Sequence, residues 1–407
     1  MIVQKYGGTS VGSMARIEAV ANKIAATRAQ GQQLVVVVSA MAGETDRLDR
    51  MARHWSPTPH PREHDVVLST GEQTSIGLLC LCLQSRGIAA KSFTGAQAGI
   101  FTDDIHTRAH IQAIDTQPLL AALEAGYVAV VAGFQGITQH GDISTLGRGG
   151  SDTTAVALAA ALRAEECQIF TDVDGVYTAD PNIVPEARRL SEISFEEMLE
   201  LSSEGAKVLQ YRAVEIAGHY QVPVRVLSTF APGEGTSMHF RTERKNQVSG
   251  IAYSRTEACI SLSGIPSHVS WLPLLKGCQA GQWETDLWSQ TPAVAGVKSL
   301  SFLVHRRDLH PVAAWARTWM AQIGGQNCSI DDKVSKITLV GLGLRSKADI
   351  ITNILETLAS QGISVQSLTS SEIKVSLVVD EEYLEESVHA LHAAFELQHA
   401  DTHLCSD

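Results

Sequence analysis

Short β-rich runs alternate with helical stretches up to about residue 230, and glycine-containing turns separate them. The β-rich runs lie at residues 2–6, 34–39, 89–93, 127–132, 167–171 and 224–227. The helical stretches, with apolar residues at i, i+3 and i+4, lie at residues 13–30, 70–86, 118–125 and 151–162. This alternation is typical of a mainly parallel sheet covered by helices. It predicts an α/β sandwich over residues 1–245.

Charge and hydropathy exclude several classes of protein. The chain has 32 Lys and Arg against 44 Asp and Glu, a formal charge of −12, which argues against a nucleic-acid-binding surface. Its long apolar runs, such as 76–83 and 155–162, fall well short of the roughly 20 residues that span a bilayer. Residues 1–6 read as a strand, not as a signal sequence. We therefore expect a cytoplasmic protein with no membrane partner.

The seven cysteines form no C-x-x-C pair, which favours reduced, mostly buried thiols over a disulfide framework. No metal site is expected from them.

A segment rich in Pro, Gly and basic residues at 231–247 marks the predicted domain boundary. Two weakly similar units follow, which begin with ISLSGI at Ile260 and ITLVGL at Ile337. In the second unit, strand, helix, strand, strand and helix succeed each other, the order of a small α+β module. The predicted domains are 1–245, 248–330 and 331–407. Linear boundaries leave open whether the two small modules are interleaved.

The first candidate phosphate-binding loop, KYGGTS at 5–10, follows the first strand and precedes a helix. Gly7 and Gly8 allow backbone N–H groups to approach a phosphate closely, and Lys5 can reach a phosphoryl group in transfer. Glycine turns after strands are also common without any ligand. The other polar and glycine-rich loops of the chain strengthen the assignment of this loop to phosphate binding.

A second glycine-rich loop, TLGRGGSD at 145–152, also opens a helix. Arg148 presents a planar fork suited to a carboxylate, and Asp152 can bind an ammonium group or position Lys5. The same residues also suit a helix-capping turn with Ser151 or Asp152 as the cap.

Further polar segments follow other strands or open other helices. They are SAMAG at 39–43 with Thr45, STGE at 69–72, and FTDVDGVYTADP at 170–181. In open parallel sheets, ligands bind outside the carboxyl ends of the strands, so we expect these loops to converge. Carboxylates and Lys207 near phosphate-binding loops suit a magnesium nucleotide, although an Asp-rich stretch can also be a solvated turn.

These motifs together resemble the aspartate kinases of the amino-acid kinase family along nearly the whole chain. The motifs that carry the resemblance are KYGGTSVG at 5–12, VVVVSAMAGETDRL at 35–48, LSTGEQTSIGLL at 68–79, AGFQGIT at 132–138, TLGRGGSDTTAVALAAAL at 145–162, TDVDGVYTADPNIV at 171–184 and GAKVLQYRAVEIA at 205–217. The resemblance implies an αβα sandwich followed by two βαββαβ-type ACT modules. It also implies phosphorylation of the L-aspartate side chain by ATP with Mg²⁺, which gives 4-phospho-L-aspartate and ADP.

The resemblance also implies a role for individual residues. Lys5 would neutralise the phosphoryl group, Gly7 and Gly8 would hold phosphate oxygens, Asp152 would orient Lys5 and the substrate amine, and Arg148 would pair with the substrate α-carboxylate. The residues implied for the aspartate pocket are Thr45, Glu72, Phe134, Gly149 and Ser151. The residues implied for the nucleotide side are Thr9, Ser39, Thr171, Asp172, Tyr177, Asp180 and Lys207.

The ACT modules of this family bind end-product amino acids and build oligomers, so a homodimer or homotetramer is expected. Two stretches here, 264–277 and 341–350, lack the family's D-x-P-G effector turn and contain Trp271 and Lys347. We expect weak or altered feedback. Asn182 stands where the family usually has an Arg that touches the nucleotide, which predicts weaker binding of MgATP.

Two alternatives to an active aspartate kinase remain at this point. One is a catalytically weak relative that acts as a sensor or partner subunit. The other is a kinase for another small amino acid.

Overall fold

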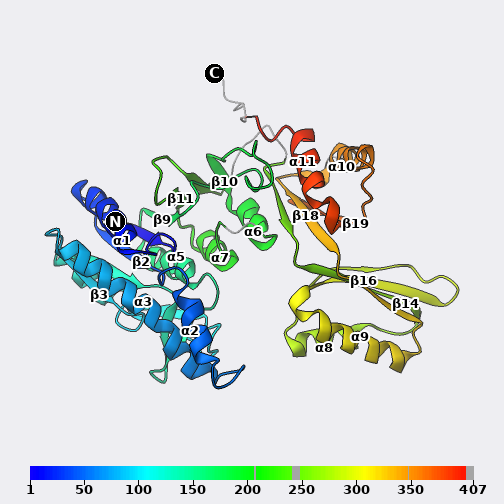
Figure 1. Ribbon diagram of the computed structural model, residues 1–407, viewed down its shortest axis with the longest axis horizontal. Coiled ribbons are helices and arrows are strands. Elements are labelled where there is room, and N and C mark those ends of the chain that lie inside the picture. The colour runs from blue at the N-terminus through cyan, green and yellow to red at the C-terminus, as the bar shows by residue number, and fades with distance from the viewer. Residues whose placement is uncertain (206–207, 241–247, 347, 400–407) are drawn as a thin grey trace. The chain divides into compact units, whose positions relative to one another are not determined.

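The computed structural model describes residues 1–205, 208–240, 248–346 and 348–399, and the chain divides into two compact units (Figure 1). Unit 1 consists of Met1–Tyr177 and Arg189–Glu243, and unit 2 consists of Thr178–Arg188 and Arg244–Asp407.

A large, mainly parallel sheet forms the centre of unit 1. Its strands are β1 (Ile2–Tyr6), β2 (Leu34–Val38), β3 (Ala90–Phe93), β6 (Val128–Ala132), β9 (Glu166–Thr171), β10 (Glu192–Ser194), β11 (Val224–Ser228) and β12 (Thr236–His239), in the order β10-β12-β11-β9-β1-β2-β6-β3. From β11 to β3 all neighbours are parallel, and β12 runs antiparallel to β11. The predicted strands are confirmed, with end points shifted by at most one residue.

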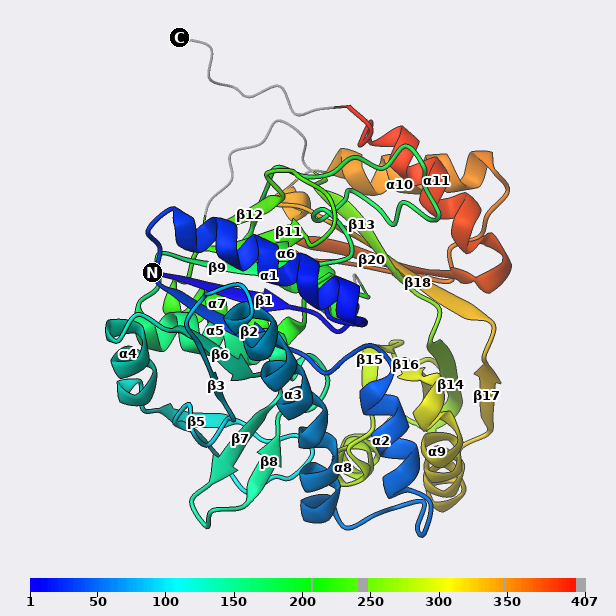
Figure 2. The same cartoon turned by 60° about the vertical axis from the view of Figure 1, so that its left-hand side comes forward.

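Helices cover both faces of this sheet, as Figure 2 shows. The helices of unit 1 are α1 (Met14–Ala29), α2 (Glu44–Ala52), α3 (Pro61–Gln84), α4 (Gln117–Glu124), α5 (Gly150–Leu162), α6 (Phe195–Ser203) and α7 (Tyr211–Tyr220), of which α2 packs on α3, and α7 packs on α5 and α6. α1 and α3 pack on one face through a core that includes Ile24, Val36 and Leu79, and α5 packs on the other face against β1, β2 and β9. β2 is buried along its whole length, as expected for a strand covered on both faces.

The helix expected at 70–86 begins nine residues earlier than predicted, at Pro61. Proline in the first turn lacks only an N–H that would have no helical partner there. By length and composition alone α3 could cross a membrane, but about half of its apolar window is buried inside the structure. It packs against β3 and β6 and buries Asp65 and Glu72, as a core helix of a folded domain does.

A second, small sheet of unit 1 was not predicted. It consists of β4 (Ile100–Thr102), β5 (Ile111–Ile114), β7 (Gln135–Thr138) and β8 (Ile143–Thr145), in the order β5-β4-β7-β8. These strands contain three or four residues each, which is too short for a period-two pattern to stand out.

Unit 2 contains two small α+β modules. The first has β14 (Glu257–Pro266), α8 (Leu272–Gly281), β15 (Thr285–Gln290), β16 (Val297–His305), α9 (Leu309–Ile323) and β17 (Asn327–Asp331), with sheet order β15-β16-β14-β17. The second has β18 (Val334–Val340), α10 (Ala348–Ser360), β19 (Ser367–Ser370), β20 (Lys374–Asp380) and α11 (Leu384–Ala394). Its sheet order is β13-β18-β20-β19, where β13 is Gly250–Ser254. The repeated strand and helix order matches the predicted internal repeat.

The modules are interleaved, which the linear boundaries 248–330 and 331–407 do not capture. β13 precedes the first module in the chain but pairs with β18 of the second. In the sheet of the second module β13 lies beside β18, just as β17 lies beside β14 in the sheet of the first. Residues 178–188 also leave unit 1: Ala179 and Val184 join the core of the second module. The first module is thus an insertion within the second.

We predict that Ile251→Ala in β13 destabilises the second module and not the first. Ile251 is buried in the second module's core, and truncation of a buried Ile to Ala costs about 2–5 kcal/mol. Hydrogen exchange should show lost protection of the amides of β18 and β20, while β14 and β16 keep theirs. The matched variant Ile260→Ala in β14 should show the reverse. Loss of protection in β14 for Ile251→Ala would contradict the interleaved arrangement.

Candidate active site

The loops that follow the parallel strands of unit 1 are hydrogen-bonded to one another. After β1, Gly7 N–H donates to Phe170 O at 3.3 Å, and Gly8 O accepts from Ala42 N–H at 3.1 Å. After β11, the hydroxyls of Thr229 and Ser10 lie 2.6 Å apart. Because parallel neighbours present their carboxyl ends at the same edge of the sheet, these loops meet there. The predicted convergence is thus observed for the loops that follow β1, β2, β9 and β11.

Lys5 and Asp152 form a buried ion pair that links the two glycine-rich loops. Lys5 Nζ lies 2.6 Å from Asp152 Oδ1, and the two side chains are only 11% and 10% exposed. Lys5 lies near the end of β1, and Asp152 lies in the first turn of α5, which packs against β1. The pair brings a cation close to backbone N–H groups of a glycine loop and to a helix N-terminus, an arrangement suited to phosphate.

Glycine is required in both loops for steric reasons. A Cβ on Gly8 would lie 2.8 Å from the backbone oxygen of Ala40, so a side chain there would push the loops after β1 and β2 apart. Gly149, which caps α5, has φ +71°, and a Cβ there would lie 1.7 Å from Gln210 Cγ. At Gly8 and Gly149 the two loops therefore present backbone and not a side chain.

Glu72 is a buried carboxyl group with one unused oxygen. It lies on α3 with 3% of its surface exposed, and its Oε1 accepts a hydrogen bond from Ala40 N–H at 3.1 Å. Its Oε2 has no hydrogen-bond partner among the described residues. Burial raises the pKa of Glu72 to about 7, against the opposing effect of the Ala40 hydrogen bond. Glu72 is thus suited to a cationic ligand group.

Phe134 has a strained backbone at the start of the segment that leads into β7. Its φ is +70°, a left-handed conformation that is unfavourable for a non-glycine residue. Its N–H donates to Thr154 Oγ1 at 3.1 Å, and its carbonyl accepts from Leu146 N–H at 2.9 Å. A Cβ on Gly150 would lie 2.9 Å from the Phe134 ring. The structure thus places Phe134 against the second glycine-rich loop.

The remaining residues expected in the aspartate pocket lie on or beside the same loops. Ser151 is buried in the first turn of α5, and Thr45 is half-buried in the first turn of α2. Arg148 is exposed, and it makes no hydrogen bond or ion pair with the described residues. Its guanidinium is therefore available to a ligand.

The residues expected on the nucleotide side are only partly brought together. Ser39 directly follows β2, Thr171 ends β9, and Asp172 accepts a hydrogen bond from the Thr171 hydroxyl at 3.0 Å. Tyr177 donates to Asp174 Oδ1 at 2.7 Å in unit 1. Thr9 lies in the first glycine-rich loop, where its carbonyl accepts from Arg16 at 2.6 Å.

Asp180 lies in unit 2, where both of its carboxylate oxygens have partners. Tyr253 OH donates to Oδ2 at 2.9 Å, and Asn182 donates to Oδ1 through its backbone and side-chain nitrogens, both at 2.9 Å. Asn182, which stands where the family usually has an Arg, thus donates its hydrogen bonds within its own loop. Lys207 falls outside the described residues.

Sequence reasoning missed two residues that shape these loops. Gln210, which caps α7, packs against Gly149, and Asp65 on α3 accepts hydrogen bonds from the end of β8. For Asp65 a signal was available: it is a carboxylate within an apolar helix, seven residues before Glu72 and so on nearly the same face.

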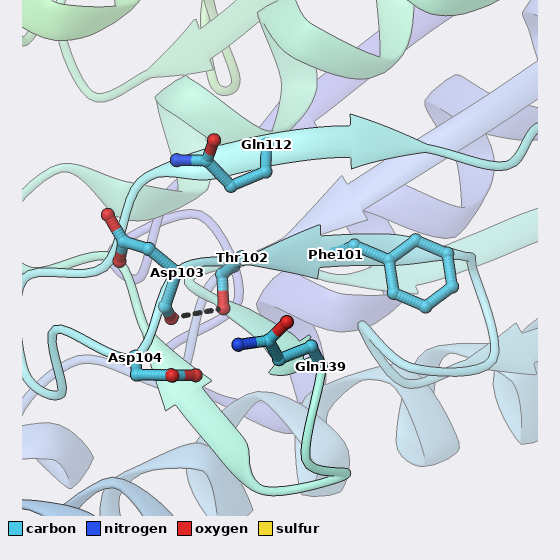
Figure 3. Close-up of a pocket in the computed structure, with 6 residues that line it drawn as sticks. All are labelled: Phe101, Thr102, Asp103, Asp104, Gln112 and Gln139. Carbon is cyan, nitrogen blue, oxygen red and sulfur yellow. Dashed lines mark hydrogen bonds between the residues drawn. The ribbon is translucent and has the colours of Figure 1, made fainter.

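A recess of about 450 Å³ lies on the small sheet, and Figure 3 shows the side chains around it. Its lining residues are Phe101, Thr102, Asp103, Asp104, Gln112 and Gln139. None of them was predicted as a site residue, and the glycine-rich loops do not contribute to it. We assign it no ligand.

Comparisons with known proteins agree with this arrangement. The model of the amino acid kinase family matches residues 1–228, and an ACT domain model matches residues 337–395. The aspartokinase of Pseudomonas aeruginosa is 50% identical over 402 residues, and the aspartate kinase of Pseudomonas putida is 49% identical over 401 residues; each alignment covers 98% of both chains.

The solved structure of Escherichia coli aspartokinase III in complex with aspartate and ADP has the same fold, with a TM-score of 0.80 at 23% identity over 97% of this chain and 99% of that one. The lysine at the end of β1, the two glycine-rich loops and these relatives lead to one conclusion: the chain belongs to the amino acid kinase family and, within it, to the aspartate kinases.

Proposed function

We propose that this protein transfers the γ-phosphoryl group of MgATP to the side-chain carboxylate of L-aspartate in the cytoplasm. The products are 4-phospho-L-aspartate and ADP. The observation that carries the proposal is the buried ion pair between Lys5 and Asp152, set between two loops that present bare backbone. The relatives named aspartate kinase support the choice of substrate.

The chemistry demands positioning and charge neutralisation more than covalent catalysis. An oxygen of the aspartate side chain attacks the γ-phosphorus, and the bond from that phosphorus to the bridging oxygen of ADP breaks. A carboxylate is already a competent nucleophile, so no general base is needed. The Lys5 ammonium neutralises charge on the moving phosphoryl group. Gly8 N–H binds one of its oxygens, and Gly7 N–H exchanges its long 3.3 Å bond to Phe170 O for another. Asp152 holds Lys5 in place.

Three charged side chains recognise the substrate amino acid in this proposal. Arg148 is exposed without a partner in the described part of the chain, and its planar fork suits the α-carboxylate. The unpartnered Oε2 of Glu72 accepts a hydrogen bond from the substrate ammonium, which Asp152 also attracts. The walls of the proposed aspartate pocket are completed by Thr45, Phe134, Gly149 and Ser151.

The nucleotide occupies the side formed by the loops after β1, β2 and β9. The residues of unit 1 that line it in the proposal are Thr9, Ser39, Thr171, Asp172 and Tyr177. Mg²⁺ neutralises phosphate charge when it is bound with ATP, and it commonly uses one or two carboxylates plus phosphate oxygens and waters. The exposed carboxylate of Asp172 at the end of β9 fits that requirement.

The catalytically weak alternative is not favoured. A sensor or partner subunit has no need for a lysine buried against an aspartate between two phosphate-binding loops, because that arrangement is costly unless the charges are used. Relatives about 50% identical over nearly the full chain bear the name aspartate kinase or aspartokinase.

The first ACT module supports weak feedback. At the start of α8, where the family's effector turn would end, Trp271 stacks on Trp288 with ring centroids 5.3 Å apart. Trp288 in turn stacks at 4.0 Å on Phe302, a core residue. This aromatic column fills space beside the turn with side chains that are costly to displace. The corresponding Lys347 of the second module lies outside the described residues.

The modules also provide surfaces for self-association. The described sheets end on the edge strands β15 and β17 in the first module and β13 and β19 in the second, and unpaired edges are ready sites for pairing with another copy. A homodimer or homotetramer through these modules is part of the proposal.

One prediction of the proposed function concerns the reaction itself. With MgATP and hydroxylamine as an acyl-phosphate trap, the protein should form a hydroxamate from L-aspartate and little or none from L-glutamate. Lys5→Met should lower kcat by at least about 100-fold, because it removes the charge that stabilises the transition state. Lys91→Met, at an exposed lysine of another strand of the same sheet, is the matched control and should keep full activity. No hydroxamate from folded wild-type protein would refute the proposed function.

A second prediction follows from the raised pKa of Glu72. The free protein binds the substrate ammonium best when Glu72 is ionised, so kcat/KM for aspartate should fall about tenfold from pH 8 to pH 6 as the carboxyl group protonates with its pKa near 7. Glu72→Gln should have a lower kcat/KM that no longer changes across this range. An unchanged pH profile in the variant would show that Glu72 is not the titrating group.

The same variant should be more stable without substrate. Folding raises the pKa of Glu72 from 4.5 to about 7, so ionisation opposes folding increasingly as the pH rises between these values. At pH 8 the full penalty is present, and Glu72→Gln should raise the Tm by about 2 °C or more. A lower Tm for the variant would show that the buried charge is compensated.

Another prediction concerns regulation. Lysine, threonine or both together at millimolar concentration should leave activity nearly unchanged, because the aromatic column in the first module occupies space beside the effector turn. Thermal shift measurements with the same amino acids report binding independently of activity. Strong inhibition by either amino acid would contradict this prediction and leave the proposed reaction intact.

A further inference from the structure

Asp65 is a buried carboxylate that the proposed mechanism does not use. It lies on α3, two turns before Glu72, and it is fully buried. α3 packs against β8, and Figure 2 shows the two elements side by side. Burial of a carboxylate costs free energy unless hydrogen-bond donors surround it. The position of Asp65 is therefore closely tied to the positions of the donors around it.

Donors from two separate segments meet at this carboxylate. Thr145, the last residue of β8, donates its hydroxyl to Oδ1 at 2.6 Å and its backbone N–H to Oδ2 at 3.1 Å. Thr107 N–H lies 3.1 and 3.0 Å from the two oxygens, and His106 Nδ1 lies 2.8 Å from Oδ2. Asp65 therefore connects α3, the 106–107 loop and the end of β8.

The backbone that Asp65 holds leads directly to Arg148. Thr145 is bound on its other side as well, since its carbonyl accepts from Ala109 N–H at 2.9 Å. The next residue, Leu146, donates to the strained Phe134. Arg148 follows three residues after Thr145, and its side chain has no hydrogen-bond or ion-pair partner within the described residues. Its position thus depends on the backbone and not on contacts of its own.

We propose that Asp65 is a positioning residue for substrate binding, which holds Thr145 and thereby places Arg148 to receive the α-carboxylate of the amino-acid substrate. The proposal rests on the proposed function, in which Arg148 binds that carboxylate. Asp65 itself does not touch the substrate. Its effect is therefore expected in the affinity for aspartate and not in the chemical step.

Asp65→Asn tests this directly. The amide keeps the size of the side chain but replaces one acceptor oxygen by a donor, which then faces N–H or O–H groups. We expect KM for aspartate to rise about tenfold, with KM for ATP and kcat each changed less than about threefold. Asp103→Asn is the matched control, because Asp103 also accepts from two backbone N–H groups and a histidine but does not contact Thr145. It should leave all three constants unchanged.

A second pair of variants decides the question if Asp65→Asn does not fold. Thr145→Ser keeps the hydroxyl that donates to Asp65 and should keep the wild-type KM for aspartate. Thr145→Val removes only that donor and should raise this KM. Equal KM values for the two variants would overturn the proposal, as would a KM for ATP that rises with the KM for aspartate.

A double-mutant cycle separates this proposal from the proposed function. If Asp65 acts through Arg148, Asp65→Asn should change KM for aspartate much less in an Arg148→Ala background than in the wild type. Equal effects in both backgrounds would overturn the positioning role while aspartate remains the substrate. Wild-type protein that does not phosphorylate aspartate would instead refute the proposed function, and with it the proposal that depends on it.

Discussion

The ion pair between Lys5 and Asp152 fixes the two glycine-rich loops of the site relative to each other. Lys5 reaches it from β1, and Asp152 reaches it because α5 begins directly after the second loop. Removal of one partner from a buried pair commonly costs about 3–5 kcal/mol, since the remaining charge is left uncompensated. The cation and the bare backbone N–H groups are thus held in place before any substrate arrives, which is the condition for electrostatic stabilisation of a transition state.

Helix α3 provides the second constraint and carries two buried carboxyl groups with different hydrogen-bonding surroundings. Asp65 is surrounded by donors and serves the structure, whereas Glu72 keeps an unpartnered oxygen and a pKa raised to about 7. The difference follows from the neighbours of each group and not from the residue type. Asp65 holds the loop that bears Arg148. Glu72 is unfavourable in its ionised form, and a substrate ammonium group would stabilise that form.

The sequence predicts the central strands of the large sheet, most clearly the continuous apolar runs of β2 and β6, and the convergence of their loops follows from the rule for parallel sheets. It misses β10 and β12, which are short and largely polar. It does not predict the start of α3, where His64 and Asp65 interrupt the apolar pattern and are buried by partners distant in the chain. Nor does it show that β13 and residues 178–188 join the second ACT module, since pairing across an inserted module leaves no local pattern. The unused oxygen of Glu72 likewise depends on packing.

The most direct test of the account is a crystal structure of the protein with aspartate, Mg²⁺ and a non-hydrolysable ATP analogue. We expect the aspartate side-chain carboxylate to lie opposite the γ-phosphate, with Lys5 Nζ bound to phosphate oxygens and still close to Asp152. We also expect Arg148 to bind the α-carboxylate and Glu72 to bind the ammonium group. Aspartate bound away from these loops, or Lys5 directed away from the phosphates, would contradict it.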